Sequence, residues 1–152
     1  MNTRPKILIV DDEEVVRRSF TRILGTADCH VKAVGSWIEV AQAMHDEPFD
    51  VVLLDLRMPD VDGMTVLRGL KQRWPDSEVV IITGYPTIET AKEAVALGAY
   101  DYLAKPVGPE QVIEASNAAM RHKRWALRAE AGLAHDKGAS LAAAASTRQL
   151  QE

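Results

Sequence analysis

Short apolar runs alternate with longer amphipathic segments over most of this chain. Four runs rich in Val, Ile and Leu stand at residues 7–10, 31–34, 51–54 and 79–82, of which 31–34 is the weakest. Uninterrupted runs of this length are typical of strands buried on both faces of a parallel sheet. A fifth strand is placed at residues 100–103. The pattern predicts five strand–helix units.

The segments between the runs have helical spacing, as in Val16, Phe20 and Leu24 or in Leu67 and Leu70. Residues that favour helix ends support the same division. Starts are indicated by the capping box Ser36 and Glu39, by Thr87 and by Gly108 with Pro109, and ends by Gly25 and Gly98.

The alternation predicts a doubly wound α/β fold with five parallel strands. We expect the flavodoxin-like strand order 2-1-3-4-5, in which strands one and three are neighbours. We expect residues 1–120 to form one domain around a single core. Residues 121–152 turn basic and then rich in Ala. They are expected to extend the last helix and to end in a flexible tail.

Composition narrows the class of protein. The formal charge of −4 argues against direct DNA binding by the whole domain. The single cysteine, Cys29, cannot form an intramolecular disulfide, which is typical of a reducing compartment. We read no signal peptide and no apolar run long enough to span a bilayer, so we expect a cytoplasmic protein without a membrane partner.

The candidate chemistry lies where the predicted strands end. Asp11 and Asp12 follow the first strand, Asp55 the third and Thr83 the fourth, and Lys105 comes shortly after the fifth. Because ligands bind beyond the carboxyl ends of the strands in an open parallel sheet, these side chains should converge on one edge.

Three carboxylates in one small pocket would repel one another, and Lys105 supplies one positive charge. Carboxylate oxygens select a hard cation such as Mg²⁺. A carboxylate beside Mg²⁺, a lysine and a hydroxyl has the parts needed for phosphoryl transfer, with Asp55 as the nucleophile. The product would be an acyl phosphate, which water hydrolyses, so the modified state should be reversible.

Four motifs in register resemble the receiver domains of two-component response regulators, especially the nitrogen-regulation (NtrC-like) subgroup. They are ILIVDDEE from Ile7, VVLLDLRMPDVDG from Val51, VVIITGYP from Val79 and GAYDYLAKP from Gly98, and the resemblance spans residues 5–124.

The resemblance implies a ligand set for the metal and an acceptor for the phosphoryl group. Asp55 would be the phosphoacceptor and also a Mg²⁺ ligand. Asp11 and Asp12 would be the acidic pair that serves the metal, and the backbone carbonyl of Arg57 would complete the set.

Further assignments follow from the resemblance. Thr83 would hydrogen-bond the phosphoryl group, Lys105 would pair with it, and Tyr102 would be an aromatic switch that turns inward when Thr83 moves. The bond between Lys105 and Pro106 would be cis. Arg57 and Tyr85 would flank the pocket and influence how fast the phosphoryl group is lost.

As a response regulator the chain would be a switch and not an enzyme, apart from self-directed phosphoryl transfer and autodephosphorylation. The implied partners are a sensor histidine kinase or phosphotransfer protein and a downstream output protein, which would contact the face around the fifth strand. Trp125 and Leu127 suggest a homodimer through the extended last helix. Weak nucleic-acid contact by its basic residues is the alternative.

Simpler interpretations stand beside these. Asp11 and Asp12 could cap the first helix, and Tyr102 could be a half-exposed strand aromatic. Asp60 and Asp62 fit a turn better than a ligand set. The four histidines, His30, His45, His122 and His135, lack metal-ligand spacing and are expected to have ordinary surface or core roles.

Two other functions remain open. Phosphohydrolases with an aspartyl nucleophile typically carry an Asp-x-Asp motif after the first strand, in which the second Asp is the acid and base. Here Arg57 stands two residues after Asp55, and no general acid is visible. The chain could also be the receiver of a longer transcription regulator, in which case its end would be a linker.

Overall fold

In the computed structural model, which describes residues 4–139 of the chain, five parallel strands form one sheet in the order β2-β1-β3-β4-β5. The predicted fold and strand order are confirmed. The strands are β1 (Lys6–Val10), β2 (His30–Val34), β3 (Val51–Leu54), β4 (Glu78–Thr83) and β5 (Asp101–Ala104). The helices are α1 (Glu14–Gly25), α2 (Trp37–Asp46), α3 (Gly63–Arg73), α4 (Ile88–Ala96) and α5 (Pro109–Ala139).

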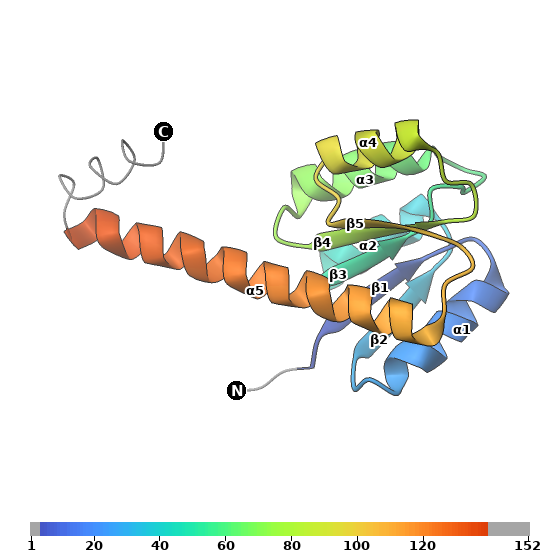
Figure 1. Ribbon diagram of the computed structural model, residues 1–152, viewed down its shortest axis with the longest axis horizontal. Coiled ribbons are helices and arrows are strands. Elements are labelled where there is room, and N and C mark those ends of the chain that lie inside the picture. Colours follow the sequence, from blue (N-terminus) through green and yellow to red (C-terminus); the bar gives the residue numbers. More distant parts are fainter. Residues whose placement is uncertain (1–3, 140–152) are drawn as a thin grey trace.

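Helices cover both faces of the sheet, and each face has its own apolar cluster (Figure 1). Helices α2, α3 and α4 pack on one face, where Leu67 and Leu70 are fully buried. Helices α1 and α5 pack on the other face through residues such as Leu24 and Val112. Strands β3 and β4 are buried along their whole length, which explains their continuous apolar runs.

The predicted helix signals are largely confirmed. Ser36 accepts a hydrogen bond from the Glu39 backbone N–H, and Thr87 caps α4 through Thr90. Gly98 has φ +101° after α4, a conformation that favours glycine. At the end of α1 the prediction is less accurate, because Gly25 is itself the last helical residue and the left-handed position falls at Asp28.

Helix α5 continues well past the sheet (Figure 1). The predicted extension from residue 121 is helical up to Ala139, and the predicted tail beyond it lies outside the described residues. None of the helices between residues 4 and 139 combines the length and apolar character that a bilayer crossing needs.

The turn into α3 leaves no room for a side chain at Gly63. A Cβ atom there would lie 2.4 Å from both the Cα and the carbonyl oxygen of Leu56. We expect Gly63→Ala to lower the free energy of unfolding by about 1–3 kcal/mol, because rigid backbone must shift. Urea denaturation followed by circular dichroism measures the change.

The matched control is Gly25→Ala, because no atom lies within 4 Å of a Cβ built at Gly25. The free energy of unfolding of this variant should stay constant or rise by up to about 1 kcal/mol. Equal destabilisation of the two variants would contradict the steric argument.

Candidate functional site

The carboxyl ends of β1 and β3 bring three carboxylates together, as predicted. Val10 and Leu54 are register partners, so Asp11 and Asp55 leave neighbouring strands side by side. One oxygen from each of Asp11, Asp12 and Asp55 lies within 4.8 Å of the others. Asp11 is 2% and Asp55 6% exposed, whereas Asp12 is open to solvent. The sheet register therefore holds like charges close together in a partly desolvated place.

Lys105 reaches back into this acidic group. Its Nζ lies 2.8 Å from Asp11 Oδ2, 3.3 Å from Asp55 Oδ2 and 3.9 Å from Glu13 Oε1. Burial acts to lower the pKa of Lys105, but the hydrogen bond and negative charge of Asp11, followed by those of Asp55, outweigh it and raise the pKa. The side chain therefore remains an ammonium ion across the neutral range. The cis peptide bond before Pro106 is also present.

The Asp55 carboxyl responds to the same crowding. Burial is the largest cause that raises its pKa, and the charge of Asp11 adds to it. A hydrogen bond from the Arg57 backbone N–H, 3.1 Å from Asp55 Oδ1, and the Lys105 ammonium act in the opposite direction without cancelling the rise. Three carboxylates around one ammonium leave two negative charges unbalanced. This arrangement suits a divalent cation bound through oxygen.

The loop from β3 to α3 is closed on itself. The Gly63 N–H donates to the Leu56 carbonyl at 3.2 Å, and Arg57 forms an isolated bridge with Asp62. These contacts agree with the predicted turn. The sequence pattern does not indicate one further contact, in which Asp60 Oδ2 accepts a hydrogen bond from the Trp37 N–H at the start of α2. This contact links the loop to a second helix.

Thr83 and Tyr102 occupy different surroundings. Thr83 is fully buried at the end of β4, and its Oγ1 accepts a hydrogen bond from the Tyr85 N–H at 3.1 Å. Tyr102 is half-buried, and its hydroxyl lies 2.6 Å from Thr90 Oγ1 and accepts from the Thr87 N–H at 3.3 Å. The Tyr102 ring therefore joins β5 to the start of α4. Its role as a switch stays a prediction.

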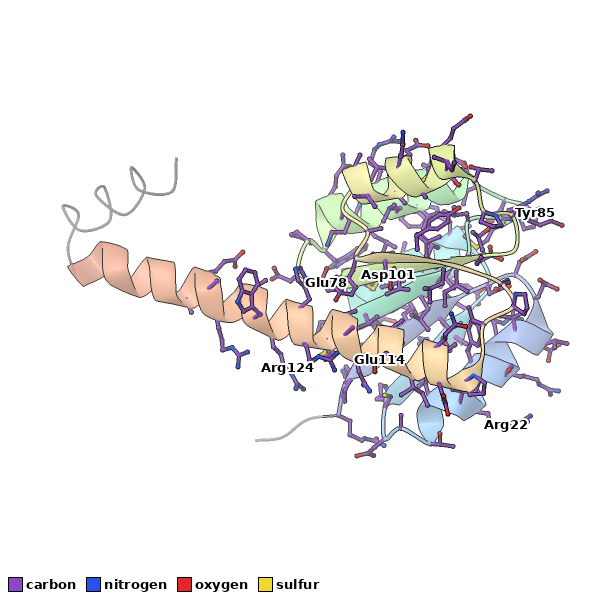
Figure 2. The ribbon with its side chains drawn as sticks, in the orientation of Figure 1. Arg22, Glu78, Tyr85, Asp101, Glu114 and Arg124 are labelled. Carbon is purple, nitrogen blue, oxygen red and sulfur yellow. The ribbon has the colours of Figure 1, made fainter. Side chains whose placement is uncertain are left out.

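A cleft of about 620 Å³, the acidic cleft, opens at this edge of the sheet. Its lining is Asp12, Glu13, Asp55, Arg57, Met58, Pro59, Gly84, Tyr85 and Lys105. The Arg57 guanidinium stacks over the Tyr85 ring, 3.8 Å from its centroid. Tyr85, labelled in Figure 2, is 65% exposed, so this contact lies at the mouth of the cleft. Both residues were expected beside the site, but their contact with each other was not predicted.

These features fit a regulatory phosphoacceptor domain with an acidic pocket, and comparison with known proteins agrees. The profile of the response regulator receiver domain family matches residues 7–117, and the chain belongs to this family. Domains of the family are phosphorylated on an aspartate to switch activity, and they bind Mg²⁺ at an acidic pocket. The subgroup resemblance agrees with relatives described as NtrX-like.

Among curated proteins, the response regulator protein PilR of Pseudomonas aeruginosa is 35% identical over 119 residues, which cover 78% of this chain and 27% of that protein. A putative NtrX-like response regulator of Rickettsia bellii is 36% identical over 109 residues, covering 70% of this chain and 23% of that protein. The chain thus spans about a quarter of the length of these relatives.

Solved structures share the fold. The beryllofluoride-activated NtrC4 receiver domain dimer is 33% identical, with a TM-score of 0.74, and the match covers 78% of this chain and 98% of that one. A CheY-like receiver domain protein of Methanospirillum hungatei is 26% identical, with a TM-score of 0.77, and the match covers 80% and 98%. Membership of this regulatory family removes the phosphohydrolase alternative.

Asp55 should destabilise the metal-free fold at neutral pH. Its pKa is raised in the folded chain, so the folded chain holds that proton more tightly than the unfolded chain. Stability is then lost as the pH rises from the ordinary value of 3.8 through the raised value. We expect Asp55→Asn in chelator-treated buffer at pH 7 to raise the free energy of unfolding by about 0.5–2 kcal/mol.

Urea denaturation at about pH 7 and at about pH 4 measures this effect, which should shrink at the lower pH as Asp55 becomes protonated. Asp76→Asn is the control, because that carboxylate is exposed in a loop and its removal should change little. A less stable Asp55→Asn variant at neutral pH would show that the ionised carboxylate stabilises the site.

Proposed function

We propose that Asp55 accepts a phosphoryl group from a sensor histidine kinase or a phosphotransfer protein. The observation that carries the proposal is a buried carboxylate held 3.3 Å from the Lys105 ammonium and beside Asp11 and Asp12. An Asp55 carboxylate oxygen would form a bond to phosphorus while the bond from phosphorus to the donor's imidazole nitrogen breaks. The electron pair of the broken bond returns to that nitrogen.

The residues around Asp55 have complementary tasks in this reaction. The Arg57 N–H holds Asp55 Oδ1, which orients the carboxylate. Lys105 offers an ammonium to a phosphoryl oxygen, and Asp11 keeps Lys105 in place through the 2.8 Å contact. Asp11, Asp12, Asp55 and the Arg57 carbonyl would hold Mg²⁺. When bound, this ion neutralises negative charge on the carboxylates and the phosphoryl oxygens.

The modified state ends by hydrolysis. A water molecule attacks phosphorus, the bond from phosphorus to the Asp55 oxygen breaks, and inorganic phosphate leaves while the carboxylate is restored. The acidic cleft is wide enough for water, and Arg57 and Tyr85 stand at its mouth. This self-directed loss would make the signal transient.

Thr83 and Tyr102 would transmit the effect of phosphorylation to the surface of the domain. Thr83 Oγ1 accepts from the Tyr85 N–H, and its hydroxyl would donate to a phosphoryl oxygen. A shift of Thr83 would draw the loop before α4 with it. Because Tyr102 bonds to Thr87 and Thr90 at the start of α4, its ring would be released and turn inward. The changed face around β5 is where an output protein would bind.

The proposed division of the chain follows from this mechanism. Residues 1–120 would act as the receiver in the cytoplasm, and residues 121–152 would continue α5 into a tail. Trp125 is 62% and Leu127 39% exposed on the helical extension. These apolar side chains support a homodimer through α5, with output by a downstream protein in place of direct DNA binding.

Acetyl phosphate tests the phosphoacceptor. We expect intact mass spectrometry of the wild type to show the gain of one phosphoryl group in the presence of Mg²⁺ and none in the presence of a chelator. Asp55→Asn should gain none, because its amide is not a nucleophile. Asp60→Asn is the matched control and should be modified like the wild type, since Asp60 is exposed and its contact is with α2.

If Asp55→Asn also gained a phosphoryl group, the acceptor would be another residue. Sedimentation velocity on the same samples tests the homodimer, which Trp125→Glu should prevent without affecting the mass gain, because Trp125 lies on the extension of α5. A wild type that stays monomeric after modification would overturn the dimer and leave the phosphoacceptor intact.

The coupling of Thr83 to Tyr102 has its own test. With beryllofluoride and Mg²⁺ added, we expect the NMR resonances of the Tyr102 ring to shift in the wild type and in Thr83→Ser, which keeps the hydroxyl. Thr83→Ala should bind beryllofluoride, but its Tyr102 resonances should shift much less. A full shift in Thr83→Ala would mean that the signal bypasses the hydroxyl.

A further inference from the structure

A buried carboxylate marks the place where α5 leaves the domain, at the edge of the sheet opposite the acidic cleft. Glu78 is the first residue of β4, and Tyr85 lies two residues beyond the other end of that strand. Figure 2 labels both residues. The Glu78 side chain is only 10% exposed. Because a buried carboxylate destabilises the fold unless it is paired, its partners decide the local structure.

The Glu78 carboxylate is held from α5. His122 Nδ1 forms a hydrogen bond with Glu78 Oε2. Lys71 Nζ lies 3.8 Å from Glu78 Oε1, beyond hydrogen-bond distance, and donates to the carbonyls of Pro75 and Ser77 at 3.0 Å each. Between residues 4 and 132, His122 is thus the side chain that hydrogen-bonds this carboxylate, and Lys71 adds charge at longer range.

The His122 imidazole is open to water on one side. Its side chain is 46% exposed, and a cavity of about 320 Å³ opens beside it. Its ring centroid lies 5.0 Å from that of Tyr100, just before β5, and 6.1 Å from that of Trp125 on α5. The imidazole can therefore exchange protons with solvent while it stays packed against the sheet.

Other charged groups surround His122. Lys123 on α5 donates to Asp50 Oδ1, before β3, at 2.6 Å. The remaining charged residues that line the cavity are Lys71 from α3, Asp76 from the loop before β4, and Glu130 from α5. Histidine is the side chain whose charge ordinarily changes between pH 5 and 8. Among the charged and titratable residues named at this contact, His122 is the one of this type.

We propose that His122 and Glu78 form a proton-dependent anchor that holds the root of α5 on β4 and sets the direction in which the helix leaves the domain. The imidazolium attracts the Glu78 carboxylate by its positive charge in addition to the hydrogen bond that it donates, whereas a neutral imidazole offers the hydrogen bond alone. Loss of the proton leaves Lys123 and Asp50 as the main ionic contact at the root. The anchor therefore tightens as the pH falls through the histidine range and loosens as it rises.

The geometry makes the root of α5 a sensitive place for this contact. Between residues 109 and 132 of α5, Ala119 is the last fully buried residue, and the following turn carries His122 and Lys123. Beyond that turn α5 projects away from the sheet (Figure 1). A small change of angle at the root is therefore amplified along the extension. The proposal does not depend on phosphorylation of Asp55.

Electron–electron distance measurements on the full chain test the anchor. Nitroxide labels are attached at cysteines that replace Lys32 on β2 and Arg128 on α5, which are both exposed, after Cys29→Ala removes the native thiol. We expect a narrow distance distribution at about pH 5.5 and a clearly broader one at about pH 8.5. Identical distributions at the two pH values would overturn the proposal.

Three variants assign the effect to its residues. His122→Gln keeps an amide donor but cannot carry charge, so it should give the broad distribution at both pH values. Glu78→Gln should also lose the response, because an amide carries no negative charge for the imidazolium to attract. His45→Gln, on the exposed side of α2, should respond like the wild type. A pH response that survives in His122→Gln would exclude His122 as the sensor.

Discussion

Repulsion between carboxylates at one edge of the sheet is the constraint around which this domain is organised. The parallel register of β1 and β3 forces Asp11 and Asp55 together, and both are almost fully buried. Lys105 balances only part of that charge. The fold tolerates the arrangement because the core beneath it, formed by two apolar clusters on the two faces of the sheet, fixes the strand ends.

At the opposite end of the sheet, where the strands begin, buried and half-buried carboxylates are paired with basic side chains. There Asp50 is paired with Lys123, Glu47 with Lys6, and Glu78 with His122. For Glu47 desolvation is outweighed by the hydrogen bonds and charges of Lys6 and His30, so its pKa is lowered, whereas the pKa of Asp55 is raised. Paired carboxylates fasten elements together, while the excess of negative charge at the carboxyl ends leaves that edge ready for a cation and a phosphoryl group.

The loops around the acidic cleft tie it to distant elements. Asp60 links the loop after β3 to α2, and the stack of Arg57 on Tyr85 links it to the loop after β4. Tyr102 then connects β5 with the start of α4. These contacts connect the surroundings of Asp55 with the starts of α2 and α4. They are the physical basis on which a modification at Asp55 can change a remote face of the domain.

The sequence by itself determined the five strands and the polar residues at their carboxyl ends, because buried parallel strands leave continuous apolar runs and place their carboxyl ends on one edge. Even β5 was displaced by only one residue. Tertiary structure alone decided which side chains meet. The contact of His122 with Glu78 joins residues 44 apart, and Arg57 meets Tyr85 across two loops. No local periodicity encodes such pairs, since helix packing and loop closure set the distances between them.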